Sequence, residues 1–218
     1  MNLRLFCVTI TLLFFGQTQA QLEAAIWYFG QNAGLDFRSG TPVPLTDGAL
    51  NTREGCATIS DVAGNLIFYT DGSTVWNRNH IPMPNGTGLL GNSTSTQSGI
   101  IVPKPTDPNI FYVFTADYQA YPEGINYSEV DMTLNGGLGD ITVKNTPLIA
   151  PATEKLTAVQ HANGRDVWVI THGWHNDEFL AYLVTSGGVA PAPVVSSIGI
   201  NLAGGTGPNA IGYLKVSP

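Results

Sequence analysis

The chain has 218 residues, with nine basic and sixteen acidic side chains and a formal net charge of −7. Nucleic acids and anionic membranes attract basic surfaces, so this balance argues against either as a partner. Only 11% of the residues are charged and 25 are glycine, a composition typical of extracellular β-proteins.

Residues 1–20 have the pattern of an export signal. Arg4 supplies the positive start, an apolar run covers residues 5–16, and Thr18-Gln19-Ala20 places small residues where a signal peptidase cuts. The apolar run is shorter than the roughly 20 residues that span a bilayer. We therefore expect a mature chain that begins at Gln21 and has no membrane insertion, with a retained anchor as the alternative.

Removal of this signal also removes Arg4 and Cys7. The mature chain then has eight basic residues against sixteen acidic ones, a net charge of −8. Cys56 remains as the one cysteine, so no intrachain disulfide can form. We interpret Cys56 as a small buried strand residue, because no histidine stands at a local spacing that would make it a nucleophile.

The strongest pattern is an internal repeat of short apolar runs. Residues 66–72, 111–117 and 167–173 each contain four bulky apolar residues followed by a threonine and then a turn. The threonines are 45 and 56 residues apart. Helical periodicity is weak, and glycine and proline interrupt the chain every few residues, so each run is predicted to be a buried strand.

Further strands are predicted around each run. Turn sequences separate each run from a preceding apolar segment, as expected for antiparallel hairpins. The preceding segments are residues 55–59, 99–102 and 156–159. Third strands are expected at 73–76, 125–132 and 179–185, and fourth strands at 141–145 and 194–198.

Three or four strands that recur every 45–55 residues are typical of propeller blades. The predicted fold is therefore all-β and β-propeller-like, with one domain over residues 21–218. It has three four-stranded antiparallel blades at about 50–98, 99–150 and 151–205, and the first strand of a fourth at 210–218. Three blades cannot close a ring, so we expect a fragment of a larger propeller. A β-sandwich is the alternative, although it gives no reason for the repeat.

A set of short motifs covers nearly all of the predicted mature chain: Trp27-Tyr28-Phe29-Gly30, Ala33-Gly34-Leu35-Asp36-Phe37, Glu54-Gly55-Cys56-Ala57, Phe68-Tyr69-Thr70-Asp71-Gly72, Val75-Trp76-Asn77, Met83-Pro84-Asn85-Gly86, Leu89-Leu90-Gly91, Gln97, Val102-Pro103-Lys104-Pro105, Tyr127-Ser128, Asp131-Met132, Lys144-Asn145 and Thr171-His172-Gly173-Trp174. In these residues the chain resembles a known family, the N-terminal propeller regions of large secreted proteins from gliding, Bacteroidetes-type bacteria. Those proteins commonly end in a type B sorting domain for the type IX secretion system.

The resemblance implies export by the general pathway, followed by secretion or display on the outer cell surface, with the export machinery as a partner. It implies no catalytic residue. The family's sorting domain has no counterpart in these 218 residues.

Polar residues at the ends of the repeated strands are the first candidates for a ligand site. Asp71, Asp117 and His172 stand at nearby positions in the three runs. Equivalent strand ends of a propeller meet on one face, where such side chains can bind a ligand. Aspartates at strand ends also form turns by accepting backbone N–H groups, and the sequence leaves both roles open.

A second candidate is a cluster of aromatic and imidazole side chains: His161, His172, Trp174 and His175. Two or three imidazoles with Asp177 or Glu178 could bind zinc. Histidines that bond to the backbone, beside a tryptophan that packs between blades, are the simpler interpretation. We therefore predict no metal and no cofactor.

The sequence thus favours a non-catalytic extracellular module that binds or displays a protein or glycan ligand. One alternative is a hydrolase or lactonase-like propeller with a metal in the central channel, held by His161, His172 and an acidic residue. Another is a structural spacer. No serine or cysteine constellation supports catalysis by a nucleophile.

Overall fold

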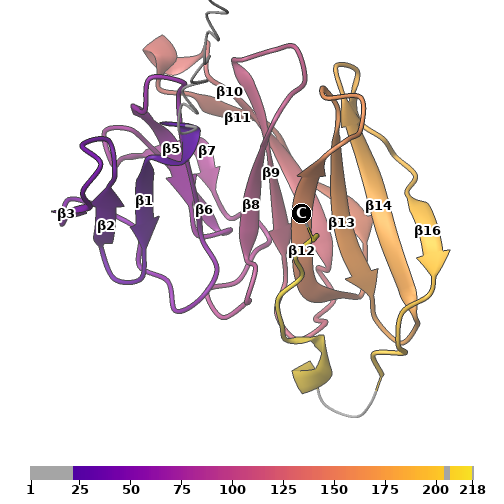
Figure 1. Cartoon of the computed structure of the whole chain (residues 1–218). Helices are drawn as coiled ribbons and strands as arrows, with labels where there is room; N and C mark the ends of the chain where they lie inside the picture. The colour runs from indigo at the N-terminus through magenta and orange to yellow at the C-terminus, as the bar shows by residue number, and fades with distance from the viewer. Residues whose placement is uncertain (1–21, 204–206, 218) are drawn as a thin grey trace, which may run out of the picture.

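The computed structural model describes residues 22–203 and 207–217, and it shows an all-β chain of four antiparallel sheets (Figure 1). The prediction of an all-β, antiparallel fold is confirmed. The export signal expected over residues 1–20 lies outside the described residues. No helix within the described ranges has the length and apolar character needed to cross a bilayer.

The four sheets follow one another along the chain. The first contains β1 (Ile26–Phe29), β2 (Ala33–Asp36) and β3 (Val43–Leu45). The second contains β4 (Ala57–Ser60), β5 (Leu66–Thr70), β6 (Thr74–Asn77) and β7 (Pro82–Thr87). The third contains β8 (Gly99–Pro103), β9 (Ile110–Ala116), β10 (Ile125–Asp131) and β11 (Asp140–Ile149). The fourth contains β12 (Ala152–Gln160), β13 (Val167–Gly173), β14 (Glu178–Thr185), β15 (Gly188–Val189) and β16 (Val194–Ser197).

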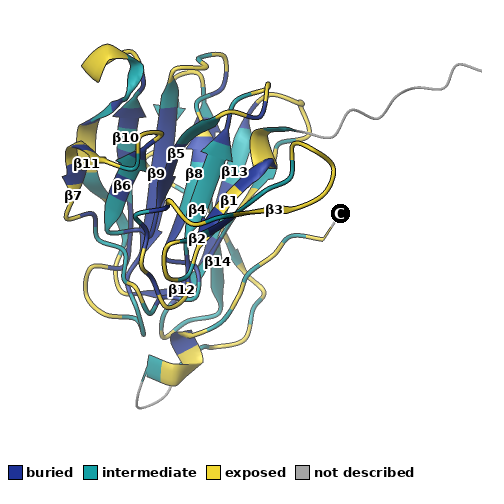
Figure 2. Ribbon diagram, turned by 90° about the vertical axis from the view of Figure 1, so that its left-hand side faces the viewer, coloured by how far each residue is buried: buried dark blue, intermediate teal, exposed yellow. Residues whose placement is uncertain are grey.

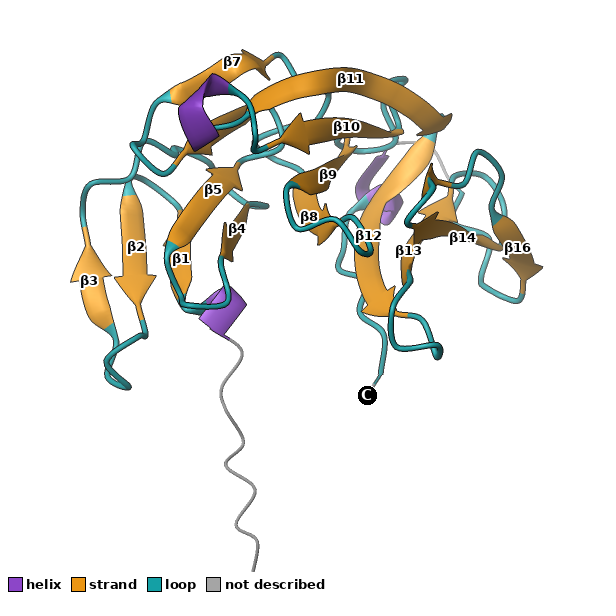
Figure 3. Cartoon of the chain, turned by 90° about the horizontal axis from the view of Figure 1, so that it is seen from above, coloured by secondary structure: helices purple, strands orange, loops and turns teal. Residues whose placement is uncertain are grey.

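Short 3-10 helices complete the described elements: η1 (Leu22–Ala24), η2 (Asn135–Gly137) and η3 (Gly207–Ala210). Seen from above, the sheets stand side by side in an open arc (Figure 3). The first strands β1, β4, β8 and β12 lie toward the concave side, and β7, β11 and β16 lie on the rim. We call the concave side the inner edge. Along it β4 contacts both β1 and β8, and β12 contacts β8.

The three matched runs are the second strands of three separate sheets. They form β5, β9 and β13, each hydrogen-bonded between the first and third strands of its sheet. None of them is helical, and no two share a sheet. The spacing of the repeat therefore corresponds to one sheet per copy.

Several expected boundaries need correction. The sheet of β1 to β3 was not predicted, because its strands have only three or four residues and are separated by glycine and polar turns. β7 was missed because Pro82 and Pro84 look like a loop, although an edge strand tolerates proline. In the fourth sheet the strand expected at 194–198 is confirmed as β16, and the two-residue strand β15, which was not predicted, also pairs with β14.

The strand expected at 210–218 is also absent from the described residues. η3 ends at Ala210, and residues 211–217 form no strand. Side chains of Thr96 and Gln97, and not a neighbouring strand, bind the backbone of this segment.

Both faces of the third sheet are buried. In β9, Phe111 and Val113 pack toward the second sheet, whereas Tyr112 and Phe114 pack toward the fourth. Successive side chains of a strand point to opposite faces, so one apolar run supplies two cores. Figure 2 shows the buried residues concentrated on central strands such as β5 and β9.

The first repeat is offset by one residue from the other two. Phe68 and Val113 each precede their threonine by two residues. Both enter the core between the second and third sheets, so Phe68 lies on the face of its sheet that points toward the third sheet, whereas Val113 lies on the face that points back toward the second. A shift of one residue exchanges the faces of a strand. The position in β5 that corresponds to Thr115 is therefore Tyr69, which packs toward the first sheet.

Truncation of a side chain between two sheets tests this packing. Phe114 is 0% exposed, so Phe114→Ala is expected to lower the free energy of unfolding by about 3–5 kcal/mol. Urea denaturation measures the change. Val62→Ala, at a turn residue that is 80% exposed, is the control and should change stability by less than about 0.5 kcal/mol. Equal effects of the two substitutions would contradict the assigned core.

Candidate binding site

The structure joins the ends of β5 and β9. The Ser98 hydroxyl donates a hydrogen bond to the carbonyl of Asp71 at 2.5 Å, and the Ser98 carbonyl accepts one from the Ala116 N–H at 3.1 Å. Asp117 follows Ala116 directly. The two aspartates singled out in the sequence therefore stand at the same end of adjacent sheets.

Both carboxylates bind the turns that follow their strands. Asp71 Oδ1 accepts from the N–H of Ser73, the hydroxyl of Ser73 and the N–H of Thr74, each at 2.8 Å. Asp117 accepts from the N–H groups of Tyr118 and Glu123 at 2.8 and 3.3 Å. Burial raises the pKa of Asp117 even though these two bonds oppose the change. In the structure, Asp71 and Asp117 therefore both act as turn formers.

His161 and His172 lie at opposite ends of β13. The hairpin places the end of β12 beside the start of β13, so His161 sits next to Asp166, whereas His172 is near the far end of the strand. His172 is buried, donates from Nδ1 to the carbonyl of Gly173 at 2.8 Å, and lies edge-on to the Phe179 ring. The two imidazoles therefore do not converge on one point, as the metal-dependent alternative would require.

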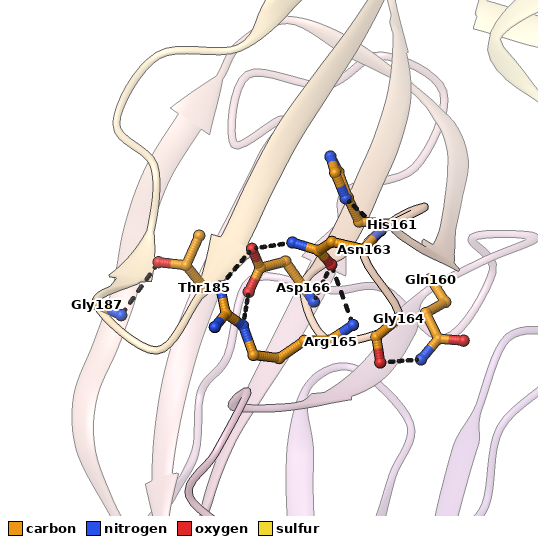
Figure 4. A network of polar contacts seen from close by, with 8 residues as sticks. All are labelled: Gln160, His161, Asn163, Gly164, Arg165, Asp166, Thr185 and Gly187. Carbon is orange, nitrogen blue, oxygen red and sulfur yellow. Dashed lines mark hydrogen bonds and ion pairs between the residues drawn. The ribbon is translucent and has the colours of Figure 1, made fainter.

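His161 belongs to a hydrogen-bonded turn between β12 and β13 (Figure 4). Its Nδ1 accepts from the Asn163 N–H at 3.0 Å. Asn163 Oδ1 accepts from the N–H groups of Arg165 and Asp166, and its Nδ2 donates to Asp166 at 2.8 Å. The bond from Arg165 holds the pKa of the Asp166 carboxyl below its usual value. These side chains fix the hairpin.

Trp174 and His175 follow β13 and contact each other, with ring centroids 4.9 Å apart. The N–H of His175 donates to the carbonyl of Leu202 at 3.1 Å, so this corner supports the segment that follows β16. Within residues 22–203 and 207–217, no group of three or more His, Cys, Asp or Glu side chains is placed to hold a metal ion.

The structure brings a different set of residues together at the inner edge. A cavity of about 220 Å³ lies between the first strands of the second and third sheets. We call it the inner-edge cavity, and it is lined by Glu54, Gly55, Cys56, Thr96, Gln97, Gly99, Ile100 and Tyr213. None of these was predicted as a site residue, because the cavity joins three segments that are far apart in the sequence.

Gln97 fixes one wall of the cavity. Its Oε1 accepts from the N–H groups of Leu156 and Leu214 at 3.0 and 2.7 Å, and its Nε2 donates to the carbonyl of Leu214 at 3.2 Å. The side-chain amide therefore pairs with the backbone of Leu214 as a neighbouring strand would. This pairing holds Tyr213 at the cavity without a strand in residues 211–217.

Glu154 does not line the cavity itself, but it holds Thr96, which does. Its side chain is fully buried and accepts three hydrogen bonds of 2.8 Å, from the N–H and hydroxyl of Thr96 and from the N–H of Gln119. The Thr96 hydroxyl also accepts from the N–H of Gly212 at 3.3 Å. Lys155 donates to the carbonyls at the end of η3. Three distant segments are thereby tied to β12.

The cavity combines an aromatic ring with polar groups. Tyr213 is 70% exposed, and Glu54, Thr96 and Gln97 add a carboxylate, a hydroxyl and an amide. Burial and the charge of Asp71 raise the pKa of Cys56, so its thiol stays protonated at neutral pH. These features suit hydrogen bonding and ring stacking more than thiolate chemistry.

A second hollow of about 380 Å³ continues toward β1 and shares Cys56 and Tyr213 with the first. Comparison of the chain with protein-family models, curated proteins and solved structures finds no match. The function must therefore be inferred from the geometry of the site and the pattern of the sequence.

Removal of the Glu154 carboxylate should loosen this region. Glu154→Ala leaves three donors without a partner, and each buried unsatisfied group costs about 1–3 kcal/mol, so we expect a loss of about 3 kcal/mol or more in urea denaturation. Glu123→Ala is the control, because Glu123 is exposed in the loop after β9. A Glu154 variant as stable as the control would refute this role.

The thiol of Cys56 reports on the cavity. In a chain that begins at Gln21, Cys56 is the one cysteine. Because its pKa is raised, the rate of alkylation by iodoacetamide should reach its plateau at a higher pH than the rate for a free cysteine. A pH profile of the alkylation rate, followed by mass spectrometry, measures this. A plateau at or below the pH of the free amino acid would contradict the buried setting.

Proposed function

We propose that this chain is part of a β-propeller that acts as an extracellular, non-catalytic binding platform associated with type IX secretion. The export pattern of residues 1–20 and the family resemblance support secretion or display on the outer cell surface. The resemblance also supports an interaction with the export machinery.

The arrangement of the sheets supports a radial fold. Each successive sheet turns its first strand to the inner edge and packs its face on the next sheet (Figure 3). Propeller blades pack in this way around a central channel. Three blades then correspond to the segments 50–98, 99–150 and 151–205, and β1 to β3 form an additional sheet before them.

The inner-edge cavity is the observation that carries the binding proposal. Its walls are fixed by Gln97 and Glu154, so little ordering is needed when a ligand enters. An exposed tyrosine ring beside a carboxylate, a hydroxyl and an amide matches the apolar face and hydroxyl groups of a sugar. A volume of about 220 Å³ suits one sugar unit of a glycan better than a folded protein surface.

The metal-dependent hydrolase is the weaker alternative. It would require His161, His172 and an acidic residue to meet at one metal, and the two histidines stand at opposite ends of β13. His172 is also buried under Phe179 and engaged with Gly173. A glycan-binding role needs neither imidazole.

Substitution of Tyr213 tests the proposal. A defined oligosaccharide array should identify a glycan bound by the chain that begins at Gln21, and isothermal titration should measure its affinity. Tyr213→Ala is expected to weaken binding by about fivefold or more, because a stacked ring contributes on the order of 1 kcal/mol or more. Glu54→Gln should weaken binding without a change in stability.

Tyr121→Ala is the matched control. Tyr121 is also an exposed tyrosine, at 49%, but it stacks on Tyr118 in the loop after β9 and does not line the cavity. It should leave the affinity unchanged. If no glycan binds, or if both tyrosine variants lose binding equally, the proposed site is refuted.

A further inference from the structure

Two pockets open at the far ends of the first strands, away from the inner-edge cavity. One lies between the second and third sheets and has a volume of about 290 Å³, and the other lies between the third and fourth sheets and has about 200 Å³. Pro103 at the end of β8 lines both pockets, whereas Gly99 at the start of β8 lines the inner-edge cavity. Both walls of each pocket are sheets of this chain, so neither pocket is an open end of the arc.

The larger pocket has an apolar floor. Ile59 and Ile67 come from the second sheet, and Pro108 and Phe111 come from the third. Ile59, Ile67 and Phe111 also belong to the core between these two sheets, so the floor is continuous with the packed interior. An apolar group that enters this pocket is therefore removed from water on several sides.

The smaller pocket is apolar as well, and we call it the valine pocket. Val102 of β8, Val159 of β12 and Val167 of β13 line it together with Pro103. Val102 and Val167 belong to the core between the third and fourth sheets. None of the described residues that line the valine pocket is charged. Each of the two pockets thus accepts an apolar side chain.

The spacing of the two pockets limits the shape of a ligand that fills both. The pockets lie on opposite sides of the third sheet, and sheets stack about 10 Å apart. Residues on one side of an extended β-strand are separated by about 6.7 Å or 13 Å. In a polyproline II helix, which has three residues per turn and a rise of about 3.1 Å, residues i and i+3 lie on one side about 9.3 Å apart. The polyproline II spacing fits the pockets and the β-strand spacing does not.

An α-helix is a poorer match for the pockets. Its residues i and i+7 are about 10.5 Å apart, but the side chains at i+3 and i+4 project from the same face between them. Pro103 is exposed between the two pockets and would meet those side chains. A polyproline II helix has no residue on that face between i and i+3.

Charge distinguishes the larger pocket, which we call the acidic pocket. Glu23 and Asp61 line it, and none of its described lining residues is basic. Arg38 lies against the same turn at Gly64, but its guanidinium is paired with Asp36 at 2.6 Å. Two carboxylates at one pocket and no charge at the other favour a ligand that carries a positive charge at one end.

We propose that the acidic and valine pockets bind a proline-rich peptide of an extracellular partner protein in the polyproline II conformation. The peptide has apolar side chains at positions i and i+3, and a lysine or arginine adjoins the apolar residue in the acidic pocket. Such a peptide loses little conformational freedom on binding, because prolines already fix its shape. The inner-edge cavity lies at the opposite ends of the first strands, so this inference and the glycan proposal can fail separately.

Synthetic peptides test the spacing and the charge. The probe is the peptide Pro-Arg-Leu-Pro-Pro-Leu-Pro, made also in reverse order, and isothermal titration measures its affinity for the chain that begins at Gln21. Moving the second leucine from i+3 to i+2 should weaken binding by about tenfold or more, because only one pocket is then filled. Replacing the arginine of the peptide by glutamate should also weaken binding, and added salt should reduce the difference.

Three tryptophan variants locate the peptide on the protein. Val62→Trp and Ala158→Trp, at exposed residues that line the acidic and the valine pocket, should each weaken binding by about tenfold or more, because the indole occupies the pocket. Val143→Trp is the matched control, since Val143 is 41% exposed on β11 and lines neither pocket. Circular dichroism and urea denaturation establish that each variant is folded.

A charge reversal completes the test. Glu23→Lys should weaken binding of the arginine peptide and strengthen binding of the glutamate peptide, a reciprocal change that loss of folding would not produce. The proposal is overturned if neither order of the probe binds, if the peptide with leucine at i+2 binds as tightly as the probe, or if both pocket variants bind like Val143→Trp. Loss of glycan binding in Tyr213→Ala with unchanged peptide binding would confirm that the two sites are separate.

Discussion

The structure depends on the burial of both faces of its inner sheets. β9 shows the constraint most clearly, because Phe111 and Val113 enter one core and Tyr112 and Phe114 enter the next. A sheet with two apolar faces has no stable place at a protein surface, so it must lie between two others. The serial stacking of sheets follows from this requirement, and the first strand of each sheet lies at the inner edge (Figure 3).

This stacking leaves the backbone of the inner-edge segments with few strand partners, and polar side chains replace them. Gln97 pairs with the backbone of Leu214, and the buried carboxylate of Glu154 accepts from Thr96 and Gln119. Hydrogen bonds of this kind offset the cost of burying polar groups. The same bonds that satisfy the chain hold Tyr213 at the cavity, so packing and recognition depend on one network.

The sequence pattern predicts the second strands of three sheets, but it does not predict β7 or the strands of the first sheet. The runs that became β5, β9 and β13 are rich in branched and aromatic residues, which is a strong local signal. β7 contains two prolines, and the strands of the first sheet are too short for a periodic pattern. The sequence does not reveal the one-residue offset of β5, because a threonine follows the apolar run in every copy. Only the position of Phe68 in the core shows that the two faces of β5 are exchanged relative to β9.

The sequence by itself determined the antiparallel strand content, the spacing of the repeat and the acidic charge, because these depend on local composition and on residues close in the chain. Only the tertiary structure decided which side chains share a site. His161 and His172 are eleven residues apart in the sequence but occupy opposite ends of β13, since a hairpin reverses the chain. Cys56, Gln97 and Tyr213 line one cavity because sheet stacking, which no local pattern encodes, brings distant segments together.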